Sequence, residues 1–326
     1  MTAPEPAERT RPPAAEGQRL PWRLVPERLQ AEVERCLRGR VAAASTQPGG
    51  FSPGVAARLV LRDGRRAFVK AVGHINPEAP DIHRAEARIA AALPAGIPAP
   101  RLLRCIDADD WVVLIFEDIE GSMPAQPWQA DELGRVLDAM TDLAAALSPA
   151  PIDAPPAASR FKNLGRGWKL LADAARSGPD LGDVDPWAGE HLTQLLALED
   201  RWPAAVAGPA LVHADIRADN ILLTPERVVF VDWPWACLAQ PWFDLAAMLP
   251  SVAMQGGPPP EDVFASHPVA RGSDPEAVTA VVATLAGTWT YLARQPDPPG
   301  LPTLRAFQQA QAVTALDWLR VRLGAT

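Results

Sequence analysis

The chain has 326 residues, of which 48% are hydrophobic and 21% charged, and its formal net charge at pH 7 is −8. This length is sufficient for two lobes with a sizeable core, and the composition is typical of soluble globular proteins. The acidic balance, with basic residues scattered along the chain, argues against nucleic acid as the main partner. No apolar stretch approaches the length of a membrane span, so no membrane partner is expected.

The cysteines and the first residues indicate a compartment and a boundary. Cys36, Cys105 and Cys237 are widely spaced and lack the spacing of metal ligands. They are predicted to be free thiols in a reducing cytoplasm. Residues 1–18 are rich in Pro, Ala, Glu and Arg and contain no apolar run. We expect a disordered tail there rather than a signal peptide or a membrane anchor.

The first third of the chain is predicted to be rich in strands. Apolar residues recur at helical spacing over 26–37, and a Gly/Pro-rich connection over 45–54 interrupts a region with strong β signals. The predicted elements are a helix over 26–37, strands over 55–62 and 66–72 joined by an Asp-Gly turn, a helix over 80–93, and strands over 102–106 and 111–116.

The remainder of the chain is predicted to be mostly helical. The predicted helices cover 129–147, 166–175, 186–202, 244–254, 274–294 and 301–323, with an irregular loop over 148–159. Because strands come first and helices follow, the order predicts an α+β fold.

Residues 211–233 interrupt this helical region and carry the strongest chemical signal. The pattern predicts a loop, a short strand, a turn and a second strand. It brings the oxygen-bearing side chains of Asp215, Asn220 and Asp232 to one mouth. A carboxylate and an amide are suited to hold a hard cation that keeps much of its water. Asp215, outside that cation shell, is suited to take a proton from an alcohol.

This segment resembles a known superfamily. His213-x-Asp215-x-x-x-x-Asn220, followed by Asp232-Trp233, resembles the catalytic loop and metal-binding Asp of protein-kinase-like enzymes. Ala214, the Trp-Pro after Asp232 and the Trp-Phe-Asp-Leu-Ala at 242–246 resemble the aminoglycoside phosphotransferase branch. The resemblance implies two lobes after the tail at 1–18. One is a small antiparallel β-sheet lobe with one main helix over 19–118, and the other is a larger, mostly helical lobe over 119–326.

The resemblance also implies an activity. The γ-phosphate of ATP, with GTP as the alternative donor, is transferred to a hydroxyl of a small molecule, either an aminoglycoside-like antibiotic or a hydroxylated metabolite. Asp215 is the implied catalytic base, and Asn220 and Asp232 are the implied Mg²⁺ ligands. Neither the acceptor nor the oligomeric state can be predicted from the sequence.

The implied nucleotide site draws on the predicted sheet lobe. Lys70 lies in an apolar strand, where an uncompensated charge is costly, so a partner is expected. By resemblance, Lys70 contacts the phosphates and Glu86 holds it. The alternatives are a lysine that reaches water and a glutamate on a solvated helix face. By resemblance, the backbone N–H groups of Gly49 and Gly50 cap the phosphates, and the alternative for these glycines is a plain hairpin turn. The implied adenine-binding hinge consists of backbone groups of Glu117, Asp118 and Ile119.

Arg217 follows the implied base by two positions. We predict that its guanidinium stabilises the transferring charge, and the alternative is a surface arginine paired with Asp219. His213 is expected to be structural, bonding the loop backbone and holding the Asp232 strand. Trp233 and Trp235 flank Asp232 and either line an acceptor pocket or pack in the core.

Two other classes of protein remain open at this point. One is a nucleotide-binding pseudokinase or regulatory module, against which the complete set of Lys70, Asp215, Asn220 and Asp232 speaks. The other is a protein kinase. It is disfavoured because the chain after Asp232 lacks an activation loop and an Ala-Pro-Glu signature.

Overall fold

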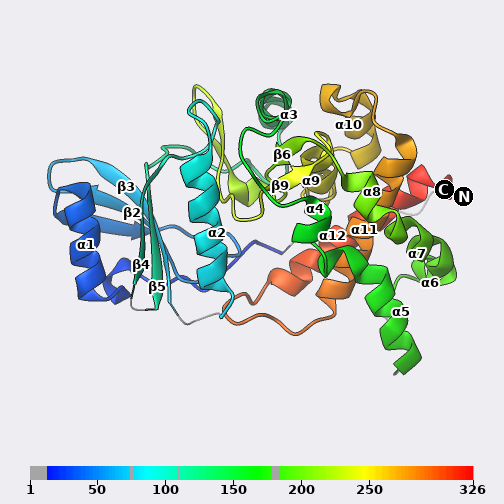
Figure 1. The fold of residues 1–326 in the computed structure, drawn as a ribbon, viewed down its shortest axis with the longest axis horizontal. Coiled ribbons are helices and arrows are strands. Elements are labelled where there is room, and N and C mark those ends of the chain that lie inside the picture. The colour runs from blue at the N-terminus through cyan, green and yellow to red at the C-terminus, as the bar shows by residue number, and fades with distance from the viewer. Residues whose placement is uncertain (1–12, 74–76, 109, 178–183, 326) are drawn as a thin grey trace, which may run out of the picture.

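The chain forms two lobes (Figure 1). The computed structural model describes residues 13–73, 77–108, 110–177 and 184–325. A five-stranded antiparallel sheet with two helices makes the smaller lobe, and a mostly helical larger lobe follows. This arrangement confirms the predicted α+β, bilobal fold class.

The smaller lobe is a single sheet between two helices. Its elements are η1 (Trp22–Leu24), α1 (Glu27–Leu37), β1 (Val41–Thr46), β2 (Val55–Leu61), β3 (Arg66–Val72), α2 (Ala79–Ala92), β4 (Leu102–Ala108) and β5 (Trp111–Phe116). The strands lie in the order β1-β2-β3-β5-β4, and neighbours run antiparallel.

The alternation of side chains along the strands assigns each face of this sheet to one helix. Val69 and Val113 point to the core shared with α1, whereas Val72 and Leu114 point to the core shared with α2. Lys70 is one residue along from Val69 and pairs with Leu114 in the register of β3 and β5. The pleat therefore places the Lys70 side chain on the α2 side of the sheet.

The larger lobe is built from helices with, among the described residues, two short antiparallel strand pairs. Its elements are α3 (Ala130–Ala146), α4 (Ala157–Arg160), η2 (Leu164–Arg166), α5 (Gly167–Ser177), α6 (Pro186–Glu190), α7 (Leu192–Asp200), α8 (Trp202–Val206), β6 (Ala210–Val212), η3 (Ala218–Asn220), β7 (Ile221–Leu223), β8 (Val228–Phe230), β9 (Cys237–Ala239), α9 (Phe243–Met254), α10 (Pro260–Ser266), η4 (Pro268–Ala270), α11 (Pro275–Ala293) and α12 (Leu304–Arg322). Within the described residues, none of the helices has both the length and the apolar character that crossing a bilayer requires.

One predicted helix of this lobe differs from the structure. The segment 186–202 forms two helices, α6 and α7, instead of one. The chain leaves helical geometry at His191, with φ −101° and ψ 13°. There the ring Nδ1 and the backbone N–H of His191 both hydrogen-bond the carbonyl of Trp187, at 2.8 and 3.0 Å. The local bonds close the first helix before the second begins.

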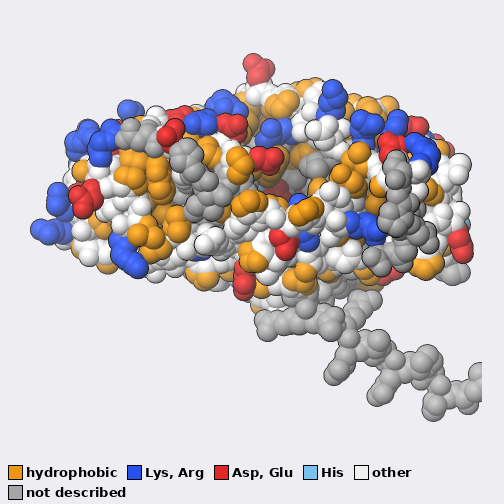
Figure 2. All heavy atoms as spheres, turned by 90° about the horizontal axis from the view of Figure 1, so that it is seen from below, with side chains coloured by type: hydrophobic (Ala, Val, Ile, Leu, Met, Phe, Trp, Pro, Cys, Tyr) orange, Lys and Arg blue, Asp and Glu red, His pale blue; other side chains and the backbone are white. Residues whose placement is uncertain are grey.

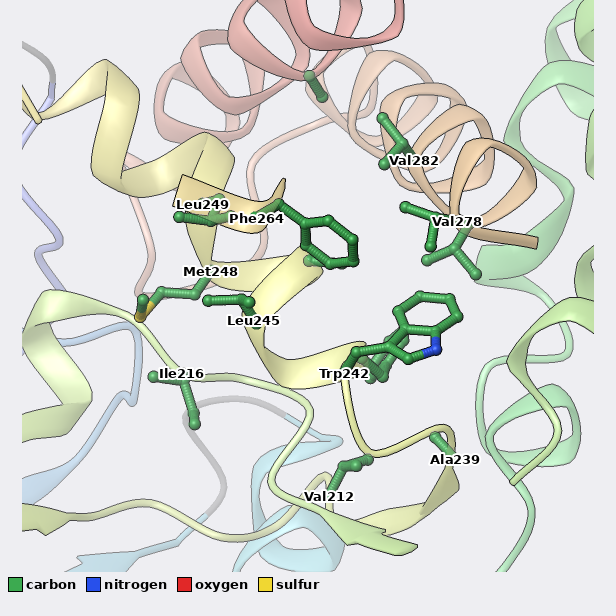
Figure 3. Close-up of a cluster of buried hydrophobic side chains, with 14 of the residues drawn as sticks. Val212, Ile216, Ala239, Trp242, Leu245, Met248, Leu249, Phe264, Val278 and Val282 are labelled. Carbon is green, nitrogen blue, oxygen red and sulfur yellow. The ribbon is translucent and has the colours of Figure 1, made fainter. Parts of the chain in front are cut away.

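The core of the larger lobe supports the segment with the chemical signal. Figure 3 shows Trp242, which directly precedes α9, near Val278 of α11, and it shows Leu245 of α9, Val212 and Ile216 in the same cluster. A buried residue in such a core is held by many close contacts. The loop that carries Asp215 is therefore attached to a rigid support.

The first described residues lie between the lobes, where Figure 1 shows them as a dark blue trace. Residues 1–12 of the expected disordered tail lie outside the described residues. Residues 13–18 instead form hydrogen bonds: Gln18 N–H donates to the Gly300 carbonyl at 2.7 Å and its carbonyl accepts from Gly54 N–H at 3.1 Å. These hydrogen bonds form because the extended backbone satisfies its polar groups against both lobes. The lobe boundary at 118/119 stays a prediction, with β5 ending at Phe116.

Candidate active site

The loop that carries Asp215 begins after β6 and is fixed by a buried carboxylate. Asp244, in the first turn of α9, accepts hydrogen bonds from the backbone N–H groups of His213 at 2.8 Å and Ala214 at 2.7 Å. Ala214 has φ +64°, a conformation that a non-glycine residue rarely adopts without such support. Burial raises the pKa of Asp244 to about 6, and the two N–H groups oppose that rise. Sequence reasoning had assigned no role to Asp244, although an acid opening an apolar helix was a signal.

His213 joins the loop to the strand that leads to Asp232. Its Nε2 donates to the Val231 carbonyl at 2.9 Å, and its Nδ1 accepts the Asp215 N–H at 3.2 Å. Burial lowers the pKa of His213 to about 4, so the imidazole is neutral. These bonds agree with the structural role expected for this histidine.

Asn220 orients the side chain of Asp215. Its Nδ2 donates to the Asp215 carbonyl at 2.8 Å and to the Asp215 carboxylate Oδ2 at 3.1 Å. With the amide nitrogen engaged there, the Oδ1 of Asn220 is the atom left to act as a ligand. Burial raises the pKa of Asp215 to about 7. Its side chain is still 24% exposed and faces a cavity.

Arg217 lies over the Asp215 carboxylate. One guanidinium nitrogen contacts Asp215 Oδ1, while Nε and Nη2 donate to the Asp219 carboxylate at 3.0 and 2.9 Å. The guanidinium also lies 5.5 Å from the ring centre of Phe51 and 5.9 Å from that of Phe307. Arg217 thus pairs with Asp219, as one alternative held, but with 13% of its side chain exposed it is not a surface residue. Its predicted role toward the transferring charge stays a prediction.

Lys70 connects the two lobes at the cleft. Its Nζ donates to Glu86 Oε1 on α2 at 2.6 Å and to Asp232 Oδ1, beyond β8, at 3.1 Å. Burial alone would lower the pKa of Lys70, but the two carboxylates outweigh burial and raise it. Burial would likewise raise the pKa of Asp232, but the Lys70 ammonium outweighs it and the pKa is lowered. The charged partner that the buried lysine required is therefore present.

The glycine-rich turn is held by a residue that sequence reasoning missed. Gly49 and Gly50 have φ +86° and +78°, and the guanidinium of Arg19 donates to the carbonyls of Gly49 and Ser52. Arg19 Nε is buried and has no hydrogen-bond partner among the described residues. Burial lowers the pKa of Arg19, while the carboxylates of Asp232 and Asp219 oppose that. The turn therefore brings a cation close to the cleft.

The hinge residues are partly engaged within the protein. The N–H of Glu117 donates to the Arg101 carbonyl at 3.0 Å, and the carbonyl of Ile119 accepts from Arg58 at 2.7 Å. The Asp118 carboxylate forms ion pairs at 3.1 Å with Arg58 and at 2.7 Å with Arg66. These bonds fix the hinge to the sheet and engage the N–H of Glu117 and the carbonyl of Ile119.

The two tryptophans beside Asp232 divide between the two expected roles. Trp233 is 2% exposed and donates through Nε1 to the Phe230 carbonyl at 2.8 Å, so it belongs to the core. Trp235 lines the cavity, and the guanidinium of Arg160 lies 4.8 Å from its ring centre.

A cavity of about 410 Å³ lies between the lobes and is bordered by Asp215, Arg217 and Asp232. Figure 2 shows one face of the molecule, with a hollow between the lobes and basic side chains gathered at the far end of the smaller lobe. The volume of the cavity falls within the range of about 300–1,000 Å³ that is common for small-molecule sites. The cavity is therefore suited to a small acceptor placed next to Asp215.

The site can accommodate a magnesium ion on chemical grounds. The side chain of Asp232 is 27% exposed, and the Oδ1 of Asn220 is turned away from the amide bonds to Asp215. Across the described residues no cluster of three or more His, Cys, Asp or Glu in metal-binding positions is found. A divalent cation would therefore take one carboxylate and one amide oxygen here, and complete its shell with water and phosphate oxygens.

Solved structures of small-molecule kinases share this fold. The aminoglycoside phosphotransferase APH(4)-Ia matches with a TM-score of 0.58 and 16% identity, over 90% of this chain and 98% of that one. The choline kinase LicA from Streptococcus pneumoniae matches with a TM-score of 0.59 and 14% identity, over the same shares of the two chains. At these identities the likeness shows the fold, which is the protein-kinase-like fold of this group.

A family model for the phosphotransferase enzyme family matches residues 48–280, more than half of the chain. The chain therefore belongs to that family. Aminoglycoside 3'-phosphotransferases from Streptomyces fradiae and Streptomyces ribosidificus are 30% and 27% identical to it over 138 and 132 residues. Each match covers 40% of this chain, and the chain spans about half the length of these curated relatives, 48% and 49%.

Proposed function

We propose that this protein is a small-molecule kinase that transfers the γ-phosphate of ATP, with GTP as the alternative donor, to a hydroxyl group. The observation that carries the proposal is the joint position of two sets of charges. Lys70 lies between Glu86 and Asp232, and the Asp215 carboxylate opens into a cavity that Asp232 also lines. A structural ion pair alone would not need a second acid next to an open cavity.

The proposed step forms one bond and breaks another. The acceptor hydroxyl oxygen bonds to the γ-phosphorus, the bond from that phosphorus to the β–γ bridging oxygen breaks, and ADP leaves with the electron pair. Asp215 takes the hydroxyl proton, for which its raised pKa of about 7 is suited. Asn220 holds the carboxylate in orientation through the bond to Oδ2. Mg²⁺, held by Asp232 and Asn220, would neutralise phosphate charge.

The nucleotide is proposed to bind in the smaller lobe and its cleft. Lys70 contacts the phosphates, Glu86 keeps its ammonium in place, and the N–H groups of Gly49 and Gly50 cap the phosphates. Backbone groups of Glu117, Asp118 and Ile119 are proposed to bind the adenine edge, chiefly the carbonyl of Glu117 and the N–H of Ile119, because the N–H of Glu117 and the carbonyl of Ile119 already have partners. Solved relatives support a nucleotide site, since APH(4)-Ia was crystallised with AMP-PNP and hygromycin B and LicA with AMP.

Arg217 is proposed to act on the transferring group. Its guanidinium already touches Asp215, so it borders the place where the acceptor hydroxyl and the γ-phosphate meet. A planar fork of N–H donors matches phosphate oxygens and can spread its contacts over two of them. The free thiols of Cys36, Cys105 and Cys237 fit our further proposal that the reaction takes place in the cytoplasm.

A screen of hydroxyl-bearing compounds for stimulated ADP release tests the proposal. The purified chain with Mg²⁺ and ATP should release ADP faster when an acceptor is present, and Asp215→Asn should abolish the stimulation while still binding AMP-PNP. Nucleotide binding without any turnover across the screen would favour the pseudokinase reading. Phosphorylation of a generic peptide would favour a protein kinase instead.

A further inference from the structure

Part of the wall of the cavity beside Asp215 is apolar and aromatic. We call this part the acceptor wall. Its residues follow α4, begin α8 and α9, lie on α11, or lie between β8 and β9, and they are Phe161, Trp202, Trp235, Phe243, Leu285, Trp289 and Leu292. The aromatic side chains present large, rigid apolar surfaces that gain free energy when a ligand covers them. The wall is therefore built to bury carbon rather than charge.

Carboxylates are confined to the other parts of the cavity. Among the described residues that line it, the acids are Glu78, Asp215 and Asp232. Asp215 is paired with Arg217 and Asp232 with Lys70, and Glu78 comes from the smaller lobe just before α2. None of the described residues of the acceptor wall is acidic, so a cationic ligand finds no counter-charge there.

The charge near this wall is positive. The Arg160 guanidinium lies 4.8 Å from the ring centre of Trp235, so a cation already occupies one aromatic face. Arg305, at the start of α12, also lines the cavity. A ligand ammonium at the wall would be repelled by these groups and would lose its hydration without an acidic partner, and the attraction of the aromatic faces would have to offset both costs.

One polar atom of the wall has no partner. Trp202 is 4% exposed, and its indole Nε1 has no hydrogen bond among the described residues. A Cβ added at Gly165, which also lines the cavity, would lie 2.7 Å from that nitrogen. The Gly165 backbone therefore packs against the indole and covers its N–H, so the wall offers a ligand apolar surface at Trp202 rather than an accessible donor.

We propose that the acceptor of the phosphate is an uncharged, mainly apolar alcohol with ring surface. The inference rests on the proposed function and names the substrate class of that same site. An aminoglycoside carries several ammonium groups, each of which needs a carboxylate that the acceptor wall lacks. The hydroxyl lies at Asp215, and the ring surface lies on the aromatic wall.

Calorimetric titrations with three probes test this class. The purified full chain, loaded with AMP-PNP and Mg²⁺, is titrated with 2-(2-naphthyl)ethanol, with choline and with kanamycin A. We expect the neutral naphthyl alcohol to bind at least about tenfold more tightly than either cation. Tighter binding of kanamycin A or choline, or no binding of the naphthyl alcohol, overturns the apolar class.

Variants that place a carboxylate in the wall sharpen the test. Leu285→Glu, and Leu292→Glu as a second variant at the end of α11, should weaken the naphthyl alcohol about tenfold and strengthen kanamycin A. Val313→Glu is the matched control, because Val313 on α12 is 49% exposed and lies outside the cavity wall. If both wall variants bind AMP-PNP but leave all three affinities unchanged, the inference is wrong. A wild-type chain that fails to bind AMP-PNP with Mg²⁺ instead overturns the proposed function.

Discussion

The catalytic end of the cavity and the acceptor wall handle burial in opposite ways. At the catalytic end, charges are buried in sets: Lys70 bonds Glu86 and Asp232, and Arg217 bonds Asp215 and Asp219. The acceptor wall buries aromatic carbon, and the polar atom without a partner there is the Trp202 N–H. The two regions meet within one cavity of about 410 Å³.

The difference predicts how each region responds to substitution. Removing one member of a buried charged set leaves its partners uncompensated, which costs several kcal/mol. Removing part of an apolar wall costs free energy roughly in proportion to the lost contact area. Substitutions at the catalytic end should therefore have large effects on turnover. Those in the acceptor wall should lower the affinity for one class of acceptor in proportion to the contact area lost.

The largest effect is expected for Asp215→Asn. The amide cannot take the hydroxyl proton, so kcat should fall at least about 10²-fold, the scale for a positioned general base. Affinity for AMP-PNP should remain, because the Lys70 and Asp232 contacts do not involve Asp215. Acceptor-stimulated ADP release gives kcat, and calorimetry gives the affinity. Turnover near that of the wild type would contradict the assignment of the base.

A smaller but still large effect is expected for Arg217→Ala. Charged hydrogen bonds of this kind contribute about 2 kcal/mol, so kcat should fall about 30-fold. Arg217→Lys keeps the charge but loses the planar fork, so its kcat should lie between those of the wild type and of Arg217→Ala. Steady-state kinetics with a saturating acceptor measure both variants. An unchanged kcat in Arg217→Ala would dismiss a role on the transferring charge and leave the bonds to Asp219 as purely structural.

Much of the fold could be predicted because its signals are local. The strands over 66–72 and 111–116 were predicted to the residue, since each is an apolar run bounded by turn residues. The signal for the loop that carries Asp215 was also local, because Asp215 and Asn220 are five positions apart and belong to a single motif. The break of the helix at His191 was not predictable, because it depends on bonds that the ring makes to Trp187.

Parts of the site had no local signal. Arg19 lies in a segment without periodicity, and its partners are the carbonyls of Gly49 and Ser52, about 30 positions away. The unpartnered N–H of Trp202 is a property of the packed lobe and cannot be read from neighbouring letters. The acceptor wall combines segments that are more than 100 positions apart, from Phe161 to Trp289. Spacing patterns do not record which of these segments meet.

The charged region should also make the fold sensitive to acid. His83, which lines the cavity, donates through Nδ1 to the Ala79 carbonyl at 2.9 Å, and burial lowers its pKa from 6.5 to about 4. The unfolded chain therefore binds the proton more readily. The stability from neutral His83 is fully present above pH 6.5 and is lost as the pH falls toward 4, by up to about 2 kcal/mol between pH 7 and 5.

The substitution His83→Asn isolates this contribution. Its amide N–H can replace the bond to Ala79 but does not titrate, so the variant should lose less stability between pH 7 and 5 than the wild type does. His213 is unchanged in both proteins, which makes the difference specific to His83. Urea denaturation at the two pH values measures it. Equal losses in the two proteins would show that His83 does not contribute.

The smallest effect is expected for Arg19→Ala, which tests how the glycine-rich turn is held. The substitution removes the bonds to the Gly49 and Ser52 carbonyls, so the turn loses support worth about 1 kcal/mol and AMP-PNP should bind about fivefold more weakly. Arg23→Ala is the control, because Arg23 is exposed in the neighbouring η1 turn. Calorimetry gives both affinities. Tighter binding of AMP-PNP to Arg19→Ala would mean instead that the guanidinium occupies space that the phosphates need.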